Sequence, residues 1–332
     1  MIHRPELGAD PATNHRVLQA VLDEPPGKLE LPPGRHVLAD GLRVPGGWTV
    51  RGTDAVDDDG GAVASWLVSE GGAGHPVLHV LGSDVSVSDL GLVPAPSDPG
   101  EHGGDRGTAL TVGEYLYDAD PQWISRVDVR RVRVDHGGLR TANGVAVMGA
   151  VRDVTLHDIT VLGGYTGLAV HWGAAGADVS SITGQTWHPH RLTVTDLRVR
   201  NAVEGFYLSS VHDVRVAGAC LRDVEMGFRL LPGDNTDRFT SGTDVGARIT
   251  VADVCVRWSG PHYAVRVAGW GRSEVDGLVS VLAYRDTVIR DCRLAGTGRA
   301  DSWSPLLFEK ATGVELRDVR VQTATDACCR LA

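Results

Sequence analysis

The sequence lacks the features that mark helical or disordered proteins. Among its 332 residues, long stretches rich in Leu, Ala, Glu and Lys are rare, whereas glycine (42 residues) and valine-rich runs are frequent. This composition favours strands and turns over helices. Hydrophobic residues make up 42% and charged residues 22% of the chain. The chain can therefore bury a core, and disorder is not expected.

The sequence also lacks a basic block and a long apolar run. The net charge is −10, and no cluster of Lys and Arg interrupts the acidic background. Nucleic-acid phosphates are therefore not an expected partner. No apolar run approaches the length of a membrane span, and the first residues lack the apolar segment of a signal peptide. We expect a cytoplasmic protein with no membrane partner.

The cysteines are few, and their spacing is irregular. They are Cys220, Cys255, Cys292, Cys328 and Cys329. An odd number without short paired spacings argues against a disulfide framework and against a thiolate zinc site. We interpret them as small apolar residues of a reducing compartment, with Cys292 inward and Cys220 and Cys255 outward on a repeated strand.

A repeated pattern dominates what the sequence does contain. Its form is apolar-x-apolar-x-Asp-apolar-x-apolar, as in VSVSDLGL (85–92), VTLHDITV (154–161), LTVTDLRV (192–199), ITVADVCV (249–256) and VELRDVRV (314–321). A second short strand, usually introduced by Gly, lies between the copies. Where nothing is inserted, this strand recurs after 22 or 23 residues, as from Phe206 to Phe228 and from Val145 to Leu168.

A rung of this length with short strands and tight turns predicts an all-β fold, a right-handed parallel β-helix. We expect one domain over residues 1–332, with about nine to ten rungs. Residues 1–28 would form an N-terminal cap with a short helix at Asn14–Leu22, and residues 29–332 the solenoid. Parallel strands lie ~4.8 Å apart, so equivalent residues of successive rungs stack in columns.

The chain resembles the pectate-lyase-like superfamily of right-handed parallel β-helix proteins. The resemblance rests on LPPGRHVL (31–38), VPGGWTVRG (44–52) and the rungs as far as residue 331. It implies the fold but no single activity, because the superfamily contains lyases, hydrolases, epimerases, transglycosylases and non-enzymes. DGLVSVLAYRD (276–286) is similar to a segment of the inulin fructotransferases, which implies Asp276 as an acid or nucleophile.

The repeated aspartates are interpreted as structural residues. One Asp per rung, at the same place between two strands, is typical of a repeated turn. The outward arginines near them are interpreted as solvated residues with weak ion pairs. These arginines are Arg130, Arg133, Arg198, Arg222, Arg257, Arg290, Arg317 and Arg320.

The middle residues of the Gly-introduced strands change along the chain. Early rungs have small residues there, whereas successive middle rungs have Tyr207, Arg229 and Arg266. Neighbouring arginines repel each other unless an anionic group, from the protein or from a ligand, lies between them. The predicted catalytic candidates are Tyr207, Arg229, Arg266, His171, Glu309 and Asp276.

Four long insertions follow these same strands, at 113–126, 173–189, 232–248 and 269–286. Long loops on a rigid solenoid commonly build a functional groove. Aromatic rings can stack on sugars while charged groups bind hydroxyls, although the same residues can simply pack the loops. The predicted substrate-binding residues are Trp172, Trp187, His188, His190, Asp234, Asp237, Arg238, Trp270 and Tyr284.

No cofactor is predicted. His171, His188 and His190 could meet at a zinc ion, but their spacing does not guarantee ligand geometry. Asp234 and Asp237 lie in one loop, but the spacing of its acidic residues does not match a known calcium loop.

Several functions remain open. The leading hypothesis is lyase or epimerase chemistry on an anionic sugar-like substrate, with Arg229 or Arg266 neutralising its carboxylate and Tyr207 or His171 moving a proton. A glycoside hydrolase or transglycosylase would use paired carboxylates instead. A biosynthetic isomerase, cyclase or dehydratase would act on a small metabolite. A non-catalytic binding solenoid would neutralise its arginines with its own carboxylates. Homo-oligomerisation is left open.

Overall fold

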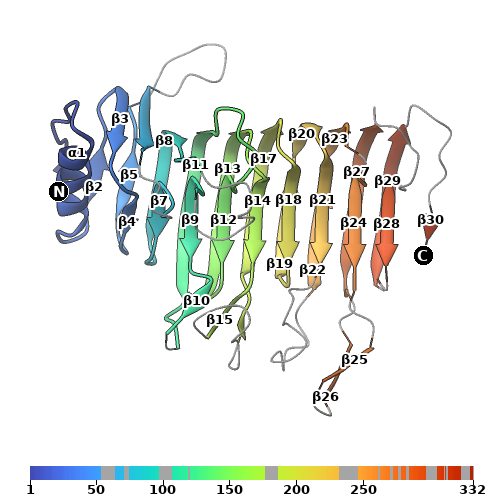
Figure 1. Cartoon of the computed structure of the whole chain (residues 1–332). Helices are drawn as coiled ribbons and strands as arrows, with labels where there is room; N and C mark the ends of the chain where they lie inside the picture. The colour runs from blue at the N-terminus through green and yellow to red at the C-terminus, as the bar shows by residue number, and fades with distance from the viewer. Residues whose placement is uncertain are drawn as a thin grey trace.

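A computed structural model describes most of the chain. The described residues are 1–53, 64–70, 75–96, 107–118, 120–175, 186–231, 246–260, 262–269, 272–275, 278–281, 284–296, 305–309, 311, 313–322 and 330–331. Successive strands wind into stacked rungs, and two long parallel sheets run side by side from the N-terminal to the C-terminal end (Figure 1). The fold is the predicted right-handed parallel β-helix.

The first sheet contains the copies of the eight-residue pattern. Its fifteen strands are β1 (Ile2–His3), β2 (Lys28–Glu30), β3 (Gly34–Leu38), β5 (Thr49–Arg51), β6 (Ser65–Ser69), β8 (Val85–Val93), β11 (Ile124–Asp135), β13 (Val151–Leu162), β17 (His190–Arg200), β19 (His212–Ala217), β20 (Cys220–Val224), β22 (Ala247–Ala252), β23 (Cys255–Trp258), β27 (Thr287–Gly296) and β29 (Val314–Gln322).

The second sheet contains the short strands introduced by Gly. Its ten strands are β4 (Leu42–Val44), β7 (Leu78–Val80), β9 (Leu110–Gly113), β12 (Val145–Met148), β14 (Thr166–His171), β18 (Glu204–Ser209), β21 (Met226–Leu231), β24 (Val265–Ala268), β28 (Leu306–Glu309) and β30 (Arg330–Leu331). The predicted columns are present. Phe206 pairs in register with Phe228, both are fully buried, and their rings stack with centroids 4.6 Å apart.

The helix α1 (Pro11–Leu22) covers the N-terminal end of the solenoid (Figure 1). It begins earlier than the predicted Asn14, because Asp10 caps it by accepting a hydrogen bond from the Thr13 amide, and Pro11 fits the first turn. Leu18 and Leu22 of this helix are fully buried in the main core. The helix therefore covers the apolar face that the first rung would otherwise expose.

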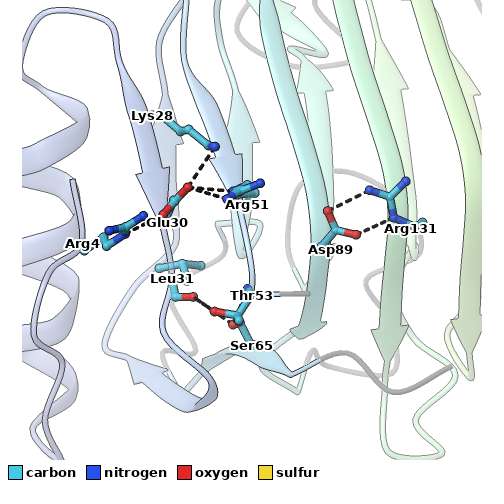
Figure 2. Close-up of polar contacts among 9 residues, drawn as sticks. All are labelled: Arg4, Lys28, Glu30, Leu31, Arg51, Thr53, Ser65, Asp89 and Arg131. Carbon is cyan, nitrogen blue, oxygen red and sulfur yellow. Dashed lines mark hydrogen bonds and ion pairs between the residues drawn. The ribbon is translucent and has the colours of Figure 1, made fainter. Parts of the chain in front are cut away.

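The first rungs are tied together by Glu30, as Figure 2 shows. Its carboxylate pairs with Arg4 (2.6 Å), Lys28 (2.9 Å) and Arg51 (2.6 Å). Hydrogen bonds from Lys28 and Arg4 lower the pKa of Glu30 to about 2. A second contact in the same view joins Arg131 to Asp89 across adjacent layers.

The repeated aspartates occupy left-handed backbone positions, within long strands except for Asp253, which lies between β22 and β23. Asp89, Asp158, Asp196, Asp253, Asp291 and Asp318 have φ between 50° and 58°. Asp and Asn tolerate this conformation better than most residues, and the strand bends there. Arg131 within β11 and Gly218 between β19 and β20 stand at the equivalent place and also have positive φ. The structural interpretation of this column is confirmed.

A second left-handed column lies at the start of the same strands and alternates in charge. Its members are Asp84, Arg126, Asp153, Arg191, Asp213, Arg248 and Asp286, all with φ between 51° and 61°. The residues on either side of each of these positions pair in register between adjacent strands, so the seven residues lie in successive layers of the sheet. Ion pairs link Arg126 to Asp84, Arg191 to Asp153 and Arg248 to Asp213, at 2.5–2.6 Å. We call these seven residues the charge ladder.

Candidate functional site

The outer face of the second sheet brings the main predicted residues together. Tyr207 on β18 is in register with Arg229 on β21, and Arg229 is in register with Arg266 on β24. The neighbouring residues Ala169 and Leu307 continue the column on either side. The Arg229 guanidinium carbon lies 4.5 Å from the centroid of the Tyr207 ring, within cation–π range.

Glu204, which the sequence analysis missed, is the partner of Arg229. It begins β18, is fully buried, and forms a two-point ion pair with the guanidinium, whose Nη2 lies 2.7 Å from Glu204 Oε2. The Thr166 hydroxyl donates a further hydrogen bond to Oε2 (3.1 Å). Burial alone would lower the pKa of Arg229, but the Glu204 carboxylate outweighs this effect and raises it above its usual value. Arg229 is therefore a fixed charge.

Arg266 also has a protein partner. Its Nη2 and Nε lie 2.7 and 2.8 Å from Oε2 of Glu309 on the neighbouring strand β28. This pair is more open, because the side chains of Arg266 and Glu309 are 31% and 40% exposed, compared with 20% and 0% for Arg229 and Glu204. Stacking of the two arginines thus does not by itself require an anionic ligand.

His171 lies at the edge of this cluster. It ends β14, and its ring centroid is 6.1 Å from that of Tyr207. His171 Nδ1 is 2.8 Å from the Trp172 carbonyl oxygen, and the Tyr115 ring packs edge-on against His171 at 5.0 Å. Tyr115 of the insertion and His171, Tyr207 and Arg229 of successive strands of the second sheet therefore form a continuous row of contacts.

The described parts of the insertions at 113–126 and 173–189 form a small sheet of their own. This sheet consists of β10 (Leu116–Tyr117), β15 (Gly173–Ala175) and β16 (Thr186–Trp187) and lies below the main strands in Figure 1. Trp187 packs on Tyr117 and is 6% exposed, and Trp172 is fully buried. Neither indole ring presents an open face for stacking on a sugar in this structure.

His188 and His190 face a different set of residues from His171. His188 lies between the Ser210 carbonyl oxygen (2.9 Å from Nδ1) and the Thr186 hydroxyl (3.1 Å from Nε2), and burial lowers its pKa to about 4. The His190 ring stacks on that of His212 with centroids 4.6 Å apart. Among the described residues, no three His, Cys, Asp or Glu side chains are arranged to hold a metal ion.

The remaining candidates divide into one core residue and several that are not described. Tyr284 is 6% exposed and belongs to the main core, and burial raises its pKa well above the usual value. Asp276, Asp234, Asp237, Arg238 and Trp270 lie outside the described residues. The groove that their loops would form therefore stays a prediction. Within the insertion at 269–286, β25 (Arg272–Val275) and β26 (Leu278–Val281) form an antiparallel hairpin.

Comparison with known proteins identifies solved structures with a similar fold. No protein-family model and no curated protein matches the chain. An endo-xylogalacturonan hydrolase from Aspergillus tubingensis is 12% identical over 100% of this chain and 95% of its own, with a TM-score of 0.57. The A-module of a mannuronan C-5 epimerase from Azotobacter vinelandii is 12% identical, covering 96% and 93% of the two chains, with a TM-score of 0.48. The Streptococcus pneumoniae surface protein and adhesin PfbA is 10% identical, covering 94% of each, with a TM-score of 0.45.

The likeness to the endo-xylogalacturonan hydrolase thus supports the right-handed parallel β-helix fold of this chain. Because the sequence identities to these proteins are low, the likeness concerns the fold alone and not the activity. In the described part of the chain, no helix has both the length and the apolar character needed to cross a bilayer.

Proposed function

We propose that this protein is an enzyme that acts on a carbohydrate bound across the outer face of the second sheet. The observation that carries the proposal is the row of His171, Tyr207 and Arg229 in successive layers, beside the accessible Arg266–Glu309 pair. Aromatic and charged groups at fixed positions of a rigid scaffold suit a sugar ring and its hydroxyls. The endo-xylogalacturonan hydrolase that shares this fold is named for a carbohydrate substrate, which supports the proposal by analogy.

The two arginines have different roles in this proposal. Arg229 holds the ring of Tyr207 and neutralises the buried Glu204, so it positions other groups. Arg266 is exchangeable, because an exposed ion pair contributes only ~0–1 kcal/mol and can open for a competing carboxylate. A substrate carboxylate would then replace Glu309 on the guanidinium of Arg266, in a two-point contact.

The chemistry that fits this arrangement is a lyase or epimerase reaction on an anionic sugar. Binding of the substrate carboxylate to Arg266 makes the adjacent C–H bond more acidic. Tyr207 would exchange that proton, with His171 nearby to accept or return it. Departure of the neighbouring leaving group completes an elimination, and return of the proton to the opposite face completes an epimerisation.

A second candidate is a non-catalytic carbohydrate-binding solenoid. The observation that favours it is the pairing of both arginines with protein carboxylates, Glu204 and Glu309. This candidate predicts binding without turnover.

The test is a screen of acidic and neutral polysaccharides that measures new double bonds, C-5 inversion by NMR, reducing ends and binding. Tyr207→Phe should lower kcat by at least about 100-fold, the usual contribution of a proton-transfer group. Arg266→Gln should lower turnover of the acidic substrates. Arg317→Gln is a matched control, since Arg317 pairs with the exposed Glu315 on the first sheet. Full activity of both site variants would refute the proposal, and binding without products would support the second candidate.

A further inference from the structure

Two cysteines stand side by side on the outer face of the first sheet. Cys220 on β20 pairs in register with Cys255 on the adjacent parallel strand β23. The next residues, Leu221 and Val256, are fully buried, so both thiols point away from the core. Both are free thiols, with Cys220 partly exposed and Cys255 exposed. By contrast, Cys292 is fully buried.

The spacing suits a bridging ion better than a disulfide. Neighbouring parallel strands lie ~4.8 Å apart, and in-register side chains leave them in the same direction. A disulfide needs Cβ atoms about 3.5–4.5 Å apart, slightly closer than this spacing, and the two thiols are not bonded to each other in this structure. A zinc–thiolate bond is about 2.3 Å long, and two bonds on that scale in a linear sulfur–metal–sulfur unit span roughly 4.6 Å, close to the spacing of the strands.

The surrounding residues select the kind of ion. Zinc prefers four ligands, and the part of the chain that is described offers no set of three or more. Soft monovalent ions such as Cu(I) are selected by thiolates. In-register neighbours of the pair are Arg198, whose guanidinium pairs with Asp158, and Arg293. Two thiolates with one monovalent ion carry a net charge of −1, which an adjacent arginine such as Arg293 stabilises.

We propose that Cys220 and Cys255 bind one soft monovalent ion, Cu(I) or its analogue Ag(I), as a two-coordinate thiolate site. This site is separate from the second-sheet cluster and does not depend on the proposed carbohydrate chemistry.

The experiment measures Cu(I) binding to the reduced protein under anaerobic conditions, in competition with a chromophoric Cu(I) chelator. Cys328 and Cys329 are first replaced by Ser, because these thiols lie outside the described residues. This parent should bind one ion per chain by native mass spectrometry, and X-ray absorption should show a two-sulfur shell. Cys220→Ser and Cys255→Ser should each weaken binding at least 100-fold, whereas Cys292→Ala should retain it.

Two outcomes would overturn the proposal. One is a single-serine variant that holds Cu(I) as tightly as the parent. The other is closure of Cys220 and Cys255 to a disulfide, seen as a loss of two mass units, in a protein that takes up no ion when fully reduced. Carbohydrate turnover, where it is detected, should be the same with and without the ion.

Discussion

Replacing Arg229 with Met should destabilise the protein far more than replacing its neighbour Arg266. Glu204 is fully buried, and its two carboxylate oxygens are satisfied by Arg229 and Thr166. Without the guanidinium, a buried carboxylate would be left without its counterion. Breaking a buried pair in this way costs about 3–5 kcal/mol. The contribution of the exposed Arg266–Glu309 pair is only ~0–1 kcal/mol.

These energies translate into separable shifts of the melting temperature. Unfolding entropies of roughly 2.1 cal/mol/K per residue give ~0.7 kcal/mol/K for 332 residues. Arg229→Met should therefore lower Tm by about 4–7 °C, and Arg266→Met by less than about 1.5 °C. Differential scanning calorimetry at pH 7 measures both. The difference in Tm between Arg229→Met and the unmodified protein should become smaller as the pH falls, because a buried Glu without a counterion becomes protonated at a higher pH than usual.

A double replacement provides the control. Glu204→Leu combined with Arg229→Met removes both charges and should recover most of the lost stability, because a hydrophobic pair often replaces a buried ion pair without loss. Equal Tm shifts for Arg229→Met and Arg266→Met, or no recovery in the double variant, would refute the assignment of Glu204 as a buried counterion.

Three further predictions concern the scaffold. Burial lowers the pKa of His136 to about 4, below the ~6.5 of the unfolded chain. The free energy of unfolding should therefore be highest above pH 6.5 and fall between pH 6.5 and pH 4, and in urea unfolding this fall should be smaller for His136→Asn. Asp253 has φ of 53°, so Asp253→Asn should be neutral in the same assay, whereas Asp253→Val should cost about 1–2 kcal/mol; equal effects would contradict a backbone role. Gly149 has φ of 72°, and a Cβ at this position would lie 2.2 Å from the Tyr117 hydroxyl. Gly149→Ala should therefore lower Tm measurably and increase proteolysis near Tyr117. An unchanged digestion pattern would contradict the idea that close packing of Tyr117 on Gly149 holds the insertion in place.

The rungs could be predicted because their physics is repetitive. Each strand alternates inward and outward residues, and each rung repeats the pattern, so the register of Tyr207, Arg229 and Arg266 followed from spacing alone. The inward Cys292 and the outward Cys220 and Cys255 followed from the same rule and are confirmed.

Glu204 could not be found by that rule. Counting back from the inward Phe206 by two residues places Glu204 in the core, yet it pairs with the outward Arg229. Glu204, Gly205 and Phe206 are all buried, so inward and outward residues do not alternate strictly at the start of this strand. The usable signal was an acidic residue before this Gly, one rung before an outward arginine. The burial of Trp172, next to an insertion, and of Trp187, within it, could not be predicted from the repeat, because insertions of irregular length have no period.

The charge ladder has a consequence for how the chain finds its correct alignment during folding. The core columns are filled by similar aliphatic residues in every rung, so apolar packing alone hardly distinguishes a rung docked on its proper neighbour from one displaced by a layer. Because Asp and Arg alternate from Asp84 to Asp286, a displacement by one layer would bring like charges together. At ~4.8 Å in water each such contact costs about 1 kcal/mol. The charge ladder should therefore disfavour rungs displaced by an odd number of layers, while contributing little to the stability of the folded solenoid.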